Sequence, residues 1–110
     1  MVTRLDVIKM IGDVLTETDV ARGSLLPDDP NRHQLDDLRV LLDDRQRKLS
    51  KAVFDENTTQ FQNAAKKLQA VNNQIQGSIQ QVNKILTVLG DIKIFLDAVT
   101  SLMAAIGPFV

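Results

Sequence analysis

Apolar residues recur at helical spacing in three stretches of the chain, and this pattern predicts an all-helical fold. In the first stretch, residues 3–16, the apolar face consists of Leu5, Ile8, Ile11 and Leu15. In the second, residues 32–54, a narrower seam consists of Leu35, Leu38, Leu42, Leu49 and Ala52. Between them, residues 17–31 hold the densest run of turn-forming residues, including Gly23, Pro27 and Pro30. We therefore expect two helices joined by a loop over residues 17–31.

The third stretch has two apolar positions that recur every seven residues, as in a bundle or coiled-coil helix. One position is occupied by Phe61, Leu68, Ile75, Val82, Leu89, Leu96 and Met103. The other is occupied by Ala64, Val71, Ser78, Ile85, Ile92, Val99 and Ile106. Because only Ser78 is polar in this seam, we expect one long helix over residues 57–106. Gly77 and Gly90 are the places where it would bend or break.

The length of that helix decides the expected shape. A continuous helix over residues 57–106 would be about 75 Å long, whereas a compact chain of this length is roughly 35 Å across. We therefore expect residues 1–110 to form a single all-helical domain with the shape of an elongated antiparallel hairpin. The helix over residues 32–54 would cover the first half of the long helix. The helix over residues 3–16 would continue in line and cover the second half.

Apolar residues surround most of the long helix beyond Ile85, more than one short covering helix could bury. A surplus apolar face of this kind is typical of a contact with another subunit or protein. The predicted interface residues are Leu86, Leu89, Ile92, Phe95, Leu96, Val99, Leu102, Met103 and Ile106. A second stripe of apolar and small residues consists of Ile94, Ala98, Ser101 and Ala105.

Composition argues against most kinds of chemistry. The chain has no cysteine and one histidine, so it offers no disulfide or thiolate metal site. His33 with Asp36 and Asp37 gives at most two metal ligands on one helix face, too few to hold zinc. Lys and Arg number 13 against 14 Asp and Glu, a balance that disfavours a nucleic-acid partner. We predict no catalytic, cofactor-binding or metal site, no small-molecule substrate and no enzymatic activity.

Charged residues also interrupt each candidate membrane or export segment. Asp91, Lys93 and Asp97 lie within the most apolar stretch, and the uncharged residues after Asp97 are too few to span a bilayer. Near the start, Asp6 and Lys9 interrupt what a signal peptide would need as an apolar run. We expect a cytoplasmic location, with export that uses no signal peptide left open.

Two functions remain for such a chain. The first is a non-enzymatic structural or interaction protein that self-associates through its coiled-coil-like C-terminal face, for assembly, scaffolding or partner binding. Its partner would be a second copy or another helical protein. The alternative is a membrane-active helical protein of the pore-forming or lysis type, whose residues 85–110 engage a bilayer surface. The sequence leaves both open, together with the number of subunits.

Overall fold

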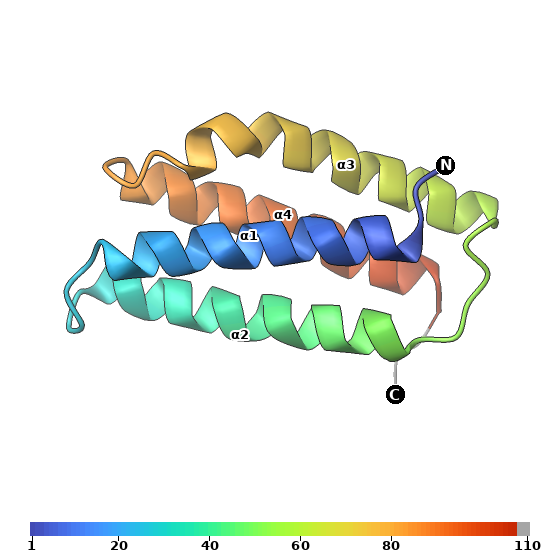
Figure 1. Cartoon of the computed structure of the whole chain (residues 1–110), viewed down its shortest axis with the longest axis horizontal. Coiled ribbons are helices and arrows are strands. Elements are labelled where there is room, and N and C mark those ends of the chain that lie inside the picture. The colour runs from blue at the N-terminus through green and yellow to red at the C-terminus, as the bar shows by residue number, and fades with distance from the viewer. Residues whose placement is uncertain (108–110) are drawn as a thin grey trace.

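The computed structural model describes residues 1–107, which form four helices and no strand (Figure 1). The helices are α1 (Arg4–Gly23), α2 (Pro30–Lys51), α3 (Thr59–Ile79) and α4 (Ile85–Ala105). They pack as a bundle that measures 43 × 28 × 17 Å along its principal axes. The predicted all-helical class is therefore confirmed.

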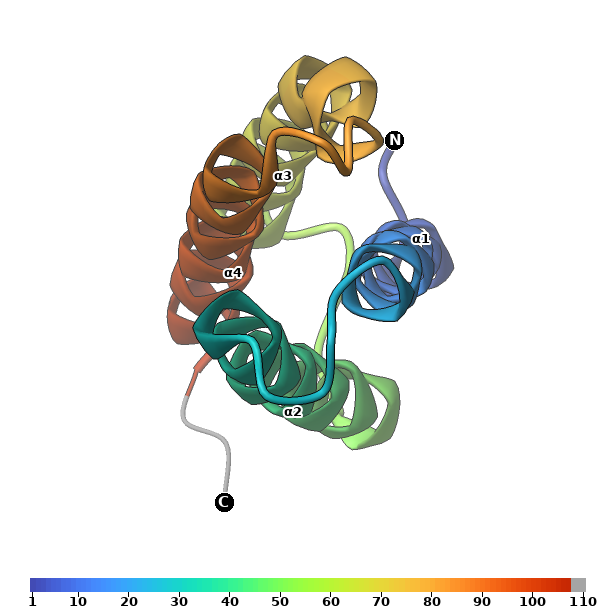
Figure 2. The same ribbon diagram turned by 90° about the vertical axis from the view of Figure 1, so that its left-hand side faces the viewer.

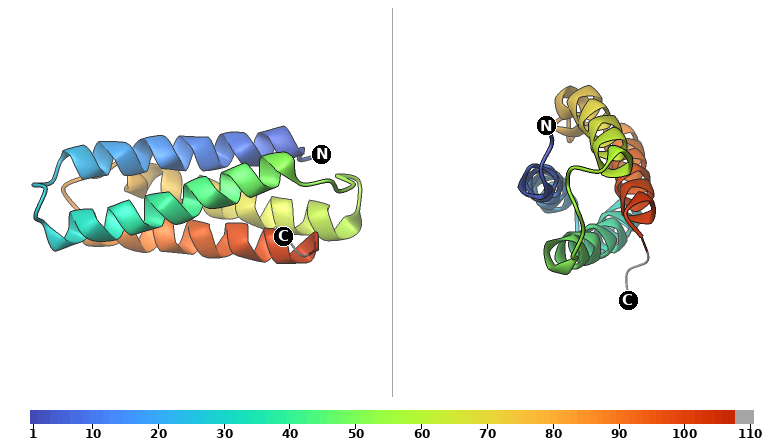
Figure 3. Two further views of the ribbon diagram at one scale, coloured as in Figure 1. Left: turned by 90° about the horizontal axis from the view of Figure 1, so that it is seen from below. Right: turned by 90° about the vertical axis from the view of Figure 1, so that its right-hand side faces the viewer.

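The bundle consists of two antiparallel hairpins, α1–α2 and α3–α4, packed against each other (Figures 1 and 3). When the bundle is viewed from one end, α2 lies beside α4 and diagonally opposite α3 (Figure 2). The connection over residues 52–58 therefore crosses the other end of the bundle diagonally (Figure 3). As a result α2 runs parallel to α4, and α1 runs parallel to α3.

The single long helix predicted over residues 57–106 is wrong. The chain reverses over residues 80–84, and the turn is held by Lys84 N donating to Gln81 O at 2.8 Å. Gly77 and Gly90, the predicted break points, both lie inside helices. The seven-residue repeat continues through the reversal, and α3 and α4 present their seams to one core from opposite directions. An unbroken repeat therefore did not require an unbroken helix.

The first two helices also pack differently from the prediction. They lie side by side as a hairpin instead of in line, and together with α3 they cover α4 (Figure 1). Because the chain folds back twice more than expected, each helix gains neighbours on two sides. Most of the apolar surplus of α4 is thereby buried within the chain.

Helix ends follow local hydrogen bonding. Thr3 and Asp6 form a reciprocal cap in which Thr3 Oγ1 accepts from Asp6 N at 3.1 Å and Asp6 Oδ2 accepts from Thr3 N at 2.9 Å. Asp29 caps α2, whose first residue is Pro30, and Thr58 caps α3. Helix α1 continues past the predicted end at residue 16, because its C-terminal turns still bury side chains against the core. The predicted loop over residues 17–31 thus shortens to residues 24–29.

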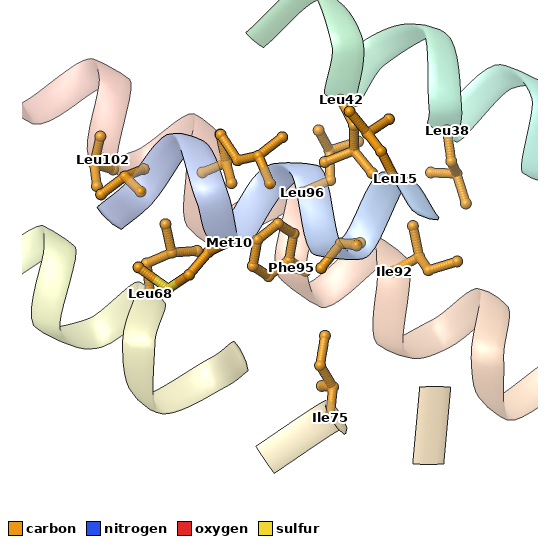
Figure 4. Close-up of a cluster of buried hydrophobic side chains, with 14 of the residues drawn as sticks. Met10, Leu15, Leu38, Leu42, Leu68, Ile75, Ile92, Phe95, Leu96 and Leu102 are labelled. Atoms are coloured by element: carbon orange, nitrogen blue, oxygen red, sulfur yellow. The ribbon is translucent and has the colours of Figure 1, made fainter. Parts of the chain in front are cut away.

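Phe95 of α4 lies at the centre of the core (Figure 4). Around it are side chains from each of the other helices, including Met10 of α1, Leu42 of α2 and Leu68 of α3. One apolar cluster thus joins all four helices.

Candidate interaction surface

The structure places most of the predicted interface of α4 inside the chain's own core. Seven of the nine residues are buried: Leu89, Ile92, Phe95, Leu96, Val99, Leu102 and Met103. Ile106 is partly buried against the same core, and Leu86 is 75% exposed. The seven buried residues are therefore not an open face of this fold. Self-association itself stays a prediction, and it needs a different surface.

A solvent-exposed groove runs between α3 and α4, with a volume of about 370 Å³. Its lining residues are Gln60, Asn63, Ala64, Lys67, Ala98, Ser101, Leu102 and Ala105. Three are alanines, and their small side chains leave the hollow between the two helix backbones unfilled. Ala98, Ser101 and Ala105 belong to the second stripe of α4, so the sequence contained a signal for this surface although the predicted interface lay elsewhere.

A second hollow of about 350 Å³ adjoins the groove at the C-terminal end of α4. It shares Gln60 and Ala105 with the groove, so the two form one continuous surface. The remaining lining comes from Ile106 and from the connection between α2 and α3: Val53, Phe54, Asp55 and Thr58. The side chain of Val53 is fully exposed. At the other end of the stripe, Ile94 is the one large apolar residue and is 53% exposed.

Ion pairs are concentrated on the other hairpin. Among residues 1–107, every ion pair lies within α1, within α2 or between these two helices. Arg39 Nε donates to Asp19 Oδ1 at 2.6 Å, and this bond, with a second from Arg22, lowers the pKa of Asp19. In the groove, by contrast, Lys67 is the one charged lining residue. The two sides of the molecule therefore differ strongly in charge.

The remaining candidate groups do not converge on a site. His33 is exposed, and the carboxylate of Asp36 accepts from the Arg22 guanidinium instead of facing the imidazole. Within the described part of the chain, no three His, Cys, Asp or Glu residues are grouped as metal ligands. A polar hollow of about 290 Å³ between α1 and α3 contains Asp6 and Asp13, but Asp13 pairs with Lys9 at 3.1 Å.

We compared the chain with known proteins. No protein family, curated protein or solved structure matches this chain. Over residues 1–107, none of the helices combines the length and apolar character needed to cross a membrane.

Proposed function

We propose that this chain is a non-enzymatic structural or interaction protein that self-associates, and that a second copy packs in the groove between α3 and α4. The groove itself is the observation that supports the proposal. Grooves lined by small and apolar residues commonly accept a helix, because two backbones can approach closely over small side chains. The expected helix here is α4 of the second copy.

The stripe on α4 is self-complementary in shape. Ile94 projects at one end, and the small residues Ala98, Ser101 and Ala105 form the hollow one to three turns further along. If two copies of α4 pack antiparallel about a two-fold axis, Ile94 of each copy lies over the hollow of the other. Such reciprocal contact is what a symmetric dimer requires.

The charge distribution also favours a second copy. Between residues 59 and 105 the α3–α4 hairpin carries six charged residues, whereas the α1–α2 hairpin carries most of the charge of the chain. A contact between two α3–α4 surfaces would therefore remove few charged groups from water. Because unpaired charges are costly to bury, covering this face has a smaller desolvation cost than covering the α1–α2 hairpin.

Light scattering behind a sizing column tests the proposal over a series of protein concentrations. We expect a mass above the 12.2 kDa of one chain, and Ile94→Asp should return it to one chain without loss of far-UV circular dichroism. Leu5→Asp is the matched control, because Leu5 is 74% exposed on the outer face of α1. A wild-type mass of 12.2 kDa at every concentration, or an unchanged mass for Ile94→Asp, would refute self-association through the groove.

The alternative of a membrane-active protein has one observation in its favour. The most apolar helix, α4, has its large side chains hidden in the closed bundle, as a protein that exposes them only at a bilayer would require. Dye release from liposomes tests this function with intact and acid-treated protein. The absence of release in both cases would exclude the membrane-active function.

The cytoplasmic location stays a prediction.

A further inference from the structure

Hydrogen bonds between the two hairpins are concentrated at one end of the bundle, where residues 52–58 connect them. The amide of Gln62, in the first turn of α3, reaches across to the start of the chain. Its Nε2 donates to Val2 O at 2.8 Å and to Glu56 O at 2.7 Å, and its Oε1 accepts from Val2 N at 3.2 Å. One side chain therefore satisfies both backbone groups of a residue that precedes α1.

Arg4 strengthens the same end. Its backbone N donates to Glu56 Oε1 at 2.7 Å, and its guanidinium lies 4.5 Å from the ring centre of Phe54. Phe54 in turn packs against Phe61 of α3 at 5.0 Å between ring centres. We call Val2, Arg4, Glu56 and Gln62 the clasp. The clasp and the two rings tie the start of α1 to both the connection and α3.

The opposite end, where residues 24–29 and 80–84 form the hairpin turns, has far fewer such bonds. Among residues 1–107, the one other side-chain hydrogen bond between the hairpins joins Lys93 Nζ to Gln34 Oε1 at 3.4 Å, between exposed groups. Helix α4 begins at this end with no side-chain cap from Lys84. Closure here depends on buried apolar side chains, including Ala21, Leu35 and Val88.

We propose that the two hairpins rotate apart about a hinge at the clasp. The turns over residues 24–29 and 80–84, which we call the tips, would then separate. Directional hydrogen bonds hold one end in a fixed geometry, whereas apolar contacts at the other end have no preferred direction. Local opening is easiest where a fold has the fewest stabilising contacts, and a hinge needs only a few residues at the ends of elements.

The opening would expose the N-terminal half of α4, in particular Val88, Leu89 and Ile92. Two of these, Leu89 and Ile92, belong to the interface predicted from the sequence. This hinge opening would allow the buried face of α4 to contact a second apolar surface while each hairpin stays folded. This motion does not depend on the groove between α3 and α4.

Distances between spin labels test the hinge, and the absence of native cysteines means that introduced cysteines alone carry the labels. The tip pair is Val20→Cys with Gln74→Cys, and the hinge pair is Leu5→Cys with Lys66→Cys. Each pair joins an exposed position of α1 to an exposed position of α3. The measurements use urea concentrations below the unfolding transition, which circular dichroism defines for each labelled protein.

We expect the distance of the tip pair to lengthen and its distribution to broaden with urea, while the hinge pair keeps its distance. Gln62→Ala should then broaden the hinge pair as well, whereas Gln69→Ala, which removes an exposed amide of the same helix, should not. Equal broadening of both pairs in the wild-type background would overturn the proposal, as would a tip pair that does not respond. Because these two outcomes are read without Gln62→Ala, the test holds even if that variant fails to fold.

Discussion

Replacing Phe95 by alanine distinguishes between two locations of this side chain, an interface between subunits and the core of a single chain. As part of an interface between subunits, Phe95 would affect the mass of the assembly and leave the single chain stable. In the structure its side chain is fully buried and lies among residues of the other three helices. We therefore expect Phe95→Ala to destabilise the individual chain.

The size of the effect follows from burial. Truncation of a buried phenylalanine to alanine costs about 3–5 kcal/mol, since apolar contacts are lost and a cavity remains. A chain of 110 residues has an unfolding entropy of about 0.23 kcal/mol/K near its midpoint, so the melting temperature should fall by about 13–22 °C. That loss is a large part of the total stability of about 5–15 kcal/mol that is typical of a domain.

Thermal and urea unfolding, followed by circular dichroism at several protein concentrations, measure the change. Leu86→Ala is the matched control, because it truncates an apolar side chain of the same helix that is largely exposed. Its stability should stay within about 0.5 kcal/mol of the wild type. If Phe95→Ala had the same melting temperature as Leu86→Ala and the wild type, the placement of Phe95 in the core would be refuted.

Three further predictions concern single positions. Gly90→Ala should stabilise the chain by about 0.5–1 kcal/mol in urea unfolding, because Gly90 lies inside a helix and an added Cβ meets no atom within 4 Å; destabilisation would indicate a break there. Gln62→Ala should cost about 1–3 kcal/mol, because backbone groups lose their partner, whereas the unfolding midpoint of Gln69→Ala should hardly move. The bond from Arg39 lowers the pKa of Asp19 below its ordinary value of 3.8. The ionised carboxylate of Asp19 therefore stabilises the fold above pH 3.8, and this stabilisation is lost as the pH falls through the lowered pKa. The urea midpoint of Asp19→Asn should therefore fall less than that of the wild type on acidification, and parallel curves would contradict this reasoning.

Local information in the sequence determined the helical class and the approximate starts of the first three helices. The apolar spacing of residues 3–16 and 32–54 identified α1 and α2. The gap between the predicted helices over residues 32–54 and 57–106 lies within the connection over residues 52–58. Such features depend on hydrogen bonds and side chains within a few residues of one another, so a linear pattern contains them.

Tertiary structure alone decided which apolar residues are buried within the chain. The seven-residue repeat is the same for one long helix and for two helices that fold back on a common core, so periodicity could not locate the reversal over residues 80–84. That reversal gives α4 three neighbours, buries Phe95 and Leu102, and leaves Ala98 and Ala105 in an open groove. The reason is physical: the spacing of apolar residues shows that a helix face will be covered, whereas only the packing of all four helices shows what covers it.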